Sequence, residues 1–311
     1  MSTPTTLELP AGVRRTTVEF SRGSFAVLEA LPATGVTELG TALLVPGYTG
    51  SKEDFLTILS DLARAGRRVL AVDLRGQYET PGPDDPAAYT LASLGEDIAE
   101  LADATDSQHL LGHSFGGLVV RESILSSGYL PTSLTLLSSG PAAVPGGRAD
   151  QLMSMLTFLD GTPREELAGK IAQLWKARLR PQVEDGGVPP HIVDFLETRM
   201  LDNNETGLLT MAAQLLRATD QTSDLARTGI PMFVLYGEDD DAWPADVQER
   251  MAASLDAQRS CIPAAAHSPA VEAPATTAQA LTKFWNATEG VAACPVITRG
   301  VDPPHPPMRA R

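Results

Sequence analysis

Apolar residues follow two different periods along this chain. Short apolar runs bounded by glycine or proline are typical of strands, whereas apolar residues three or four positions apart are typical of helices that bury one face. We predict buried strands at residues 41–47, 67–76, 107–113, 132–140 and 230–237, and helices between them at residues 51–66, 90–105 and 116–128. This alternation predicts an α/β fold, a doubly wound and mostly parallel sheet with helices on both faces.

The alternation is interrupted in the second half of the chain. Residues 142–227 contain helical patterns without a convincing strand, and we interpret them as a cap laid over one end of the sheet. The core then consists of residues 1–141 and 228–287, and its last helix is predicted at residues 269–288. The proline-rich residues 288–311 are predicted to form a loose C-terminal tail.

Charge and composition exclude some classes of partner. With 39 acidic against 24 basic residues, the net charge is −15, which argues against nucleic acid or an anionic membrane as the main partner. The chain shows neither the apolar segment of a secretory signal nor a run of about 20 apolar residues, so we expect a soluble, cytoplasmic protein. Cys261 and Cys294 are too few for a disulfide framework or a metal cluster. We expect two free thiols, with a single disulfide bridge as the alternative.

A serine stands at the end of one predicted strand, in the stretch LGHSFGG. Ser114 has Gly112 two residues before it and Gly116 two residues after it, which is the G-x-S-x-G pattern. A sharp turn from strand to helix demands small residues at these positions, because larger side chains would collide there. The turn also places the serine at a helix N-terminus, where free N–H groups favour developing negative charge. We therefore predict that Ser114 is a nucleophile.

A serine nucleophile needs a base and an acid that orients the base. Of the five histidines, His267 follows the last predicted strand, at residues 259–265, so its loop opens at the carboxyl edge of the sheet, where ligands bind in such folds. His113 sits beside the serine but points elsewhere. An acidic run, Glu238 to Asp241, follows the strand at 230–237 and supplies the acid. The pattern alone leaves Asp239, Asp240 and Asp241 open.

The serine, acid and histidine motifs resemble those of the α/β-hydrolase superfamily, and the resemblance covers residues 15–287. The elbow GHSFGG, the acid loop GEDDDAWP and the loop AHSP occur in the superfamily's order. In that common pattern the acid lies three residues after the glycine and four before a proline, which implies Asp240, with Asp241 as second choice. The resemblance also implies an oxyanion hole made by the backbone N–H groups of Tyr48 and Phe115.

One further stretch resembles the superfamily only in part. VDLRGQYETPG matches the D-x-R-G-x-G-x-S turn at Asp73, Arg75 and Gly76. It departs from that turn at Gln77, Tyr78 and Glu79, where a second glycine is expected.

The resemblance implies a serine hydrolase, similar to bacterial esterases, that cleaves a carboxylic ester through an acyl-Ser114 intermediate without a metal or organic cofactor. The expected substrate is a small to medium apolar ester. Hydrolysis of a lactone, a thioester or a C–C bond and cofactor-free perhydrolase activity use the same triad and stay open. A ligand-binding receptor with this fold is the non-enzymatic alternative.

The sequence predicts the residues that line the pocket less specifically than it predicts the triad. Trp243, next to the acid loop, is a candidate for lining it, and Met153, Phe158 and Met211 of the cap are further candidates. We expect most apolar residues in 142–227 to pack between the cap helices and some of them to face the cleft. The oligomeric state is not indicated by the sequence.

Overall fold

The computed structural model describes residues 2–291, and they form an eight-stranded sheet covered by helices. The strand order is β1-β2-β4-β3-β5-β6-β7-β8. The strands are β1 (Val13–Phe20), β2 (Gly23–Ala30), β3 (Thr41–Val45), β4 (Val69–Val72), β5 (Ser107–His113), β6 (Ser133–Leu137), β7 (Met232–Gly237) and β8 (Gln258–Ile262). Strands β1 and β2 pair antiparallel with their neighbours, and β4, β3, β5, β6, β7 and β8 are parallel. The predicted α/β fold with a mostly parallel sheet is confirmed.

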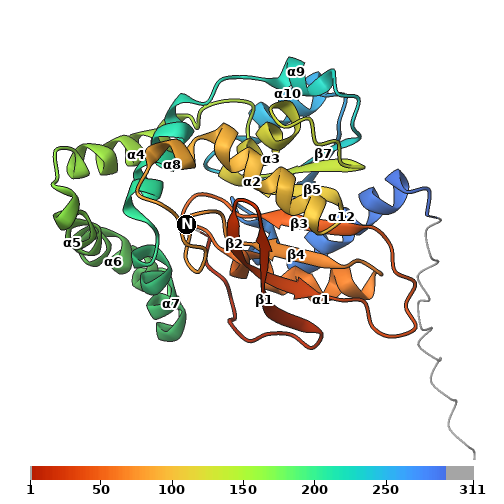
Figure 1. The fold of residues 1–311 in the computed structure, drawn as a ribbon, viewed down its shortest axis with the longest axis horizontal. Helices are drawn as coiled ribbons and strands as arrows, with labels where there is room; N and C mark the ends of the chain where they lie inside the picture. Colours follow the sequence, from red (N-terminus) through yellow and green to blue (C-terminus); the bar gives the residue numbers. More distant parts are fainter. Residues whose placement is uncertain (1, 292–311) are drawn as a thin grey trace, which may run out of the picture.

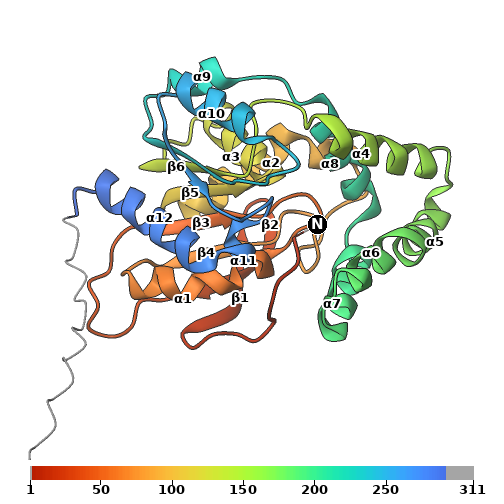
Figure 2. The same ribbon diagram turned by 180° about the vertical axis from the view of Figure 1, so that it is seen from behind.

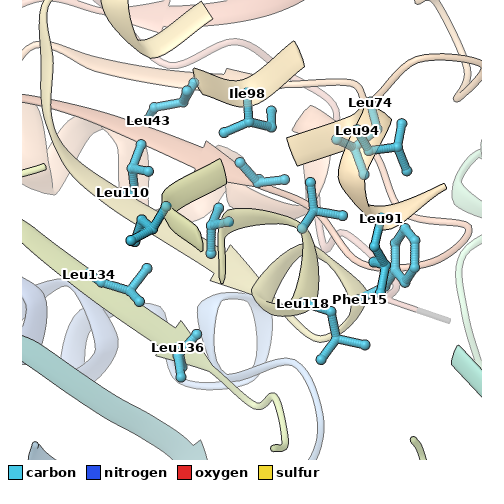
Figure 3. Close-up of a cluster of buried hydrophobic side chains, with 14 of the residues drawn as sticks. Leu43, Leu74, Leu91, Leu94, Ile98, Leu110, Phe115, Leu118, Leu134 and Leu136 are labelled. Atoms are coloured by element: carbon cyan, nitrogen blue, oxygen red, sulfur yellow. The ribbon is translucent and has the colours of Figure 1, made fainter. Parts of the chain in front are cut away.

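Helices cover both faces of the sheet because alternate strand residues point to opposite sides. In β3, Leu43 and Val45 pack against α2 (Leu91–Ala104) and α3 (Phe115–Leu125), whereas Ala42 and Leu44 belong to the cluster under α1 (Leu56–Arg64) and α12 (Pro274–Thr288). Figure 3 shows the first of these clusters, with leucines of three parallel strands facing the two helices. Both faces of these strands are buried, which explains their continuous apolar runs.

A block of helices is inserted between β6 and β7, as the interrupted alternation predicted. Its helices are α4 (Gly146–Leu159), α5 (Arg164–Leu174), α6 (Arg180–Asp185), α7 (Pro190–Leu201), α8 (Glu205–Arg217) and α9 (Thr222–Ala226), with a π-helical turn η3 (Trp175–Leu179) between α5 and α6. Helices α4 to α7 project to one side of the sheet and form an arm around one end of it (Figures 1 and 2). The arm has its own apolar cluster around Trp175. In residues 2–291, no helix is long and apolar enough to cross a membrane.

The predicted last helix at residues 269–288 is two helices in the structure. α11 (Pro269–Glu272) ends at Ala273, whose φ of −141° and ψ of 60° are not helical, and α12 begins at Pro274. The residue before a proline is disfavoured in the helical region, and this explains the break. Cys261 is exposed and forms no disulfide within residues 2–291. Cys294, its possible pairing with Cys261, and the predicted tail from residue 292 onwards lie outside the described residues.

The turn between β5 and α3 brings backbone segments closer than a side chain would allow. Ser114 adopts a φ of 54° and a ψ of −118°, a strained conformation for a residue other than glycine. A Cβ atom on Gly112 would lie 2.3 Å from the carbonyl oxygen of Gly116, and one on Gly116 would lie 2.4 Å from that of Val45. Both contacts are with backbone, so no side chain can move aside to relieve them.

We predict that Gly112→Ala lowers the free energy of unfolding by about 2–3 kcal/mol, because an added methyl group overpacks this turn. Gly147→Ala is the matched control. Its Cβ would have no neighbour within 4 Å in helix α4, where alanine is favoured over glycine. Urea unfolding measures both variants, and equal stability of Gly112→Ala and the native chain would contradict the packing argument.

Candidate active site

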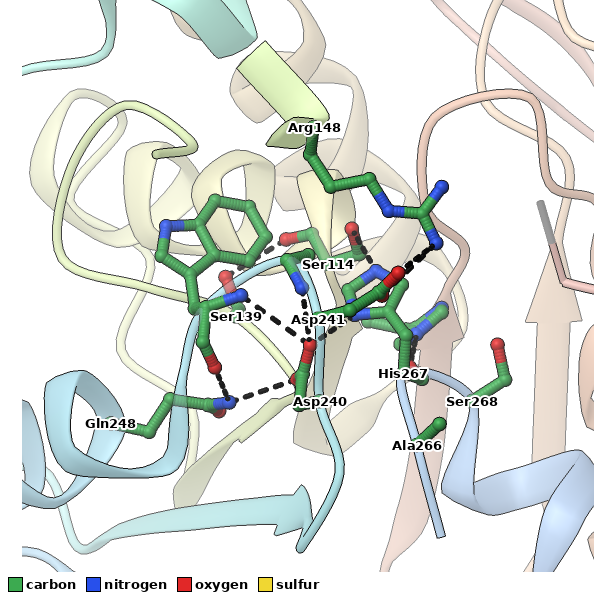
Figure 4. Close-up of polar contacts among 12 residues, drawn as sticks. Ser114, Ser139, Arg148, Asp240, Asp241, Gln248, Ala266, His267 and Ser268 are labelled. Atoms are coloured by element: carbon green, nitrogen blue, oxygen red, sulfur yellow. Dashed lines mark hydrogen bonds and ion pairs between the residues drawn. The ribbon is translucent and has the colours of Figure 1, made fainter. Parts of the chain in front are cut away.

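The structure brings Ser114, His267 and Asp240 into one hydrogen-bonded chain. Nε2 of His267 lies 2.9 Å from Oγ of Ser114, and Nδ1 of His267 lies 2.9 Å from Oδ1 of Asp240 (Figure 4). The three residues follow β5, β8 and β7, and all three loops open at the carboxyl edge of the parallel strands. Asp240 and His267, which are far from Ser114 in the sequence, thus meet it at one edge of the sheet.

Asp240 is the acid of the run that contacts the imidazole. It is buried, and it also accepts hydrogen bonds from the Ala242 amide and from Nε2 of Gln248, both at 2.9 Å. Asp239 and Asp241 are exposed. Burial alone would raise the pKa of Asp240, but the hydrogen bond from His267 and its charge outweigh burial and hold that pKa below its usual range. Asp240 therefore stays ionised where it meets His267.

His113, next to the nucleophile, holds the backbone of the other histidine. Its Nε2 donates a hydrogen bond of 2.7 Å to the carbonyl oxygen of His267. Burial, together with a charge on His267, lowers the pKa of His113 to about 4. The ring therefore remains neutral while it positions the loop of His267.

The remaining histidines lie elsewhere. His109 is buried at the opposite end of β5, where it bonds Ser133 and Glu289, and His191 is exposed in the insertion. His305 lies outside the described residues.

The backbone around Tyr48 and Phe115 faces the nucleophile. A Cβ atom on Gly47 would lie 3.1 Å from Cβ of Ser114, so the loop after β3 runs directly beside the serine. Phe115 is the first residue of α3, whose first amides have no partner within the helix. Neither the Tyr48 nor the Phe115 amide has a protein acceptor among residues 2–291. Both are therefore available to a ligand oxygen.

Gln77, which departs from the superfamily turn, fastens the loop after β3. Its Nε2 donates to the carbonyl oxygen of Gly47 at 3.0 Å, and Gln77 is buried. That carbonyl and the Tyr48 N–H belong to one planar peptide group, so a bond that fixes one of them fixes the direction of the other. Asp73 holds the far end of the same loop, because it accepts from both the backbone and the side-chain nitrogen of Lys52 at 2.7 Å.

A pocket of about 430 Å³ opens above the serine between the sheet and the insertion. Its apolar wall includes Val144, Leu152, Met155, Leu215 and Trp243. The Tyr48 ring also lines it, and the Tyr48 hydroxyl lies 3.7 Å from Sδ of Met155. The pocket is large enough for a small to medium ligand.

The structure places one of the four pocket candidates, Trp243, on this wall. The other three do not line the pocket. Met153 and Phe158 lie on exposed faces of α4, and Met211 is buried in the packing between α8 and the core. Leu152 and Met155 of α4 take their place, because the helix turns these positions, rather than 153 and 158, toward the serine.

An ion pair joins the insertion to the acid loop. Nη2 of Arg148 in α4 lies 2.9 Å from Asp241, which follows Asp240 directly (Figure 4). Arg148 is half-buried and lines the pocket, and Asp241 is exposed. Asp241 therefore contacts the insertion, whereas Asp240 contacts the histidine.

Within residues 2–291, one group of side chains could offer three ligands to a metal ion. These are Asp240, Asp241 and His267, whose ligand atoms lie within 4.8 Å of one another. Asp240 and His267 already bond each other through the atoms that would bind the ion. The expectation that no metal is required stays a prediction.

The sheet order, the helical insertion and a serine on the strand-to-helix turn are the features of an α/β-hydrolase fold. The alpha/beta hydrolase family matches residues 42–280, and the chain belongs to that family. It is an α/β-fold hydrolase.

Known proteins resemble the chain to different extents. A protein described as a carbamate hydrolase of Variovorax paradoxus is 36% identical over 99 residues, which are 31% of this chain and only 37% of that protein's length. A pimeloyl-acyl-carrier-protein methyl ester esterase of Edwardsiella ictaluri is 28% identical over 78% of this chain and 92% of its own. A solved hydrolase structure from Pseudomonas aeruginosa, 28% identical, superposes with a TM-score of 0.65 over 88% of this chain and 99% of that one.

Several polar residues of the site are not predicted by any sequence pattern. Gln77 and Gln248 carry no motif, and only the contacts of their amide groups reveal a role. Ser139, whose Oγ donates to the carbonyl oxygen of Ser114 at 2.8 Å, comes from the neighbouring strand end. The one available signal was the departure from the superfamily turn at Gln77, which marked that position as unusual.

We predict that His113→Gln makes stability less dependent on pH, because glutamine keeps a donor but cannot titrate. The histidine binds a proton near pH 6.5 in the unfolded chain and near pH 4 in the folded one. Its contribution to stability is thus fully present above pH 6.5 and is lost as the pH falls toward 4. Between pH 7 and pH 5 the loss amounts to about 2 kcal/mol. Urea unfolding at both values tests this, and parallel losses in the variant and the native chain would argue against it.

Proposed function

We propose that this hydrolase cleaves carboxylic esters through a covalent acyl-Ser114 intermediate. The observation that carries the proposal is the continuous hydrogen-bonded chain from Asp240 through His267 to Ser114, which ends in an apolar-walled pocket. The match to a methyl ester esterase over most of its length supports the choice of an ester. The expected substrate has a small to medium apolar group.

The first half of the reaction forms the acyl-enzyme. His267 Nε2 takes the Ser114 proton as Oγ attacks the ester carbonyl, and the amides of Tyr48 and Phe115 bind the oxyanion. Asp240 stabilises the imidazolium, and its depressed pKa keeps it ionised for this task. The tetrahedral intermediate then collapses, and the leaving alcohol takes the proton from His267.

The second half releases the acid. A water molecule gives a proton to His267 and attacks the acyl carbonyl, and the Ser114–acyl bond breaks as Oγ recovers its proton. The free acid leaves, and the relay returns to its starting state.

The direct test is the rate of hydrolysis of p-nitrophenyl esters from acetate to decanoate, with Ser114→Ala as the blank. We expect turnover that vanishes in the blank, and labelling of Ser114 by a fluorophosphonate. Turnover absent from all esters despite labelling would shift the assignment to lactone, thioester, C–C bond or perhydrolase chemistry. Absence of labelling would favour the ligand-binding receptor.

The acid can be identified by three parallel substitutions. Asp240→Asn should lower kcat by about 10³–10⁴, because the amide no longer stabilises the imidazolium. Asp239→Asn and Asp241→Asn are the matched controls and should stay within a few-fold of the native rate, since neither side chain contacts His267. Similar kcat values for all three variants would show that the acid is another residue.

Gln77 should affect the rate without affecting binding. Gln77→Met keeps the length of the side chain but removes the donor to Gly47, which loosens the direction of the Tyr48 amide. We expect kcat to fall about tenfold, less than the loss of 10²–10³ for a deleted oxyanion donor, with KM nearly unchanged. Gln279→Met on the exposed face of α12 is the control. A rise in KM at constant kcat would contradict an oxyanion-positioning role.

A further inference from the structure

The segment before β1 begins at buried positions and becomes more exposed toward β1. Ser2 is only 7% exposed and Pro4 is buried. Leu7 packs against the apolar cluster of the insertion. Figures 1 and 2 both show the beginning of the ribbon between the helical arm and the sheet. We call residues 2–8 the N-terminal strap.

A buried arginine fixes the strap to both parts of the fold. Arg199 of α7 is fully buried, and its Nη2 donates to the carbonyl oxygen of Ser2 at 2.6 Å. Its Nη1 donates to Oδ1 of Asp54 at 2.7 Å, in the turn that follows the loop of Tyr48. A buried guanidinium requires such partners, because an unpaired charge in the interior is strongly unfavourable. The position of Ser2 is thus tied to the insertion and to the core.

Ser2 forms part of the wall of the substrate pocket. It lines the pocket together with Ser114 and His113. A second crevice, too narrow to hold a water molecule, is lined by Ser2, Asp54, Phe55, His113, Ser268, Ala270 and Val271. Ser2 and its neighbours Asp54 and His113 border both spaces, so Ser2 stands between the pocket and the crevice. Its Oγ is buried and has no hydrogen-bond partner among residues 2–291.

We propose that the N-terminal strap determines substrate length: Ser2 closes the end of the pocket beside the nucleophile and limits the chain that fits there. This inference deepens the proposed ester hydrolysis and rests on it for the identity of the substrate, but the limit on chain length is a property of the pocket itself. Removal of the strap opens the space that residues 2–8 occupy, and this space admits a longer chain. Added bulk at Ser2 shortens the space that is left.

The test measures binding without catalysis. In the Ser114→Ala background, calorimetry gives the affinity for straight-chain 1-alkanols from butanol to dodecanol. Each methylene that enters the pocket should strengthen binding about threefold to fourfold until the chain meets the end wall. The chain length at which affinity stops rising reports the position of that wall.

Three variants, each with any purification tag at the C-terminus, are compared in this assay. Deletion of residues 2–8 should move the plateau to longer alkanols, and Ser2→Phe should move it to shorter ones. Thr5→Phe, at an exposed position of the same strap, is the matched control and should leave it in place. Opposite shifts in two variants are not a consequence of general destabilisation, and far-UV circular dichroism checks that each variant is folded.

Plateaus at the same alkanol length in the deletion, Ser2→Phe and the native chain would overturn the proposal. The same three changes in the active enzyme should move the optimum of the p-nitrophenyl ester series in the same directions. Shifted alkanol plateaus in a chain that hydrolyses no ester would uphold the strap and refute ester hydrolysis. Ester hydrolysis in variants whose alkanol plateau and ester optimum do not move would uphold the proposed function and refute the role of the strap.

Discussion

The close approach of backbone at the turn from β5 to α3 is the constraint on which the site depends. Gly112 and Gly116 allow the strand to reverse into the helix within a few residues, and Ser114 takes the strained conformation that results. In this turn the Ser114 hydroxyl meets His267, and the Phe115 amide stands at the N-terminus of α3. A larger residue at either glycine would clash with backbone atoms, and Ser114 and the Phe115 amide would move together.

The other polar groups are held in place by one another. His267 is oriented by Asp240 on its ring and by His113 on its carbonyl, and Asp240 is in turn held by Gln248. A buried network of this kind favours one arrangement, because any unpaired member would be costly. Burial also separates the roles of the two histidines. It depresses the pKa of His113, so this ring remains an uncharged support, while Asp240 stays ionised to stabilise a charge on His267.

Charged contacts beside the pocket join the insertion to the core, in addition to the apolar packing of α8. Arg148 reaches the acid loop through Asp241, and Arg199 joins α7 to Asp54 and to the backbone of Ser2. Between these two contacts lies the apolar wall that a ligand would touch. The chemistry therefore belongs to the sheet edge, whereas the size and shape of the ligand are decided by helices and by a strap from distant parts of the chain.

Local patterns in the sequence were sufficient for the strand and helix alternation, the position of the insertion, the elbow around Ser114 and the choice of His267. These features depend on residues that are neighbours in the chain, such as two glycines around a serine or an apolar run before a turn. The choice of Asp240 needed the superfamily resemblance, and its contact with His267 appears only in the fold. The roles of Gln77, Arg199 and Ser2 could not be predicted from the sequence, because the residues that they contact lie 30, 145 and 197 positions away along the chain. The prediction that Met153, Phe158 and Met211 line the pocket failed for the same reason. An amphipathic helix has a definite apolar face, but only tertiary packing decides what that face contacts.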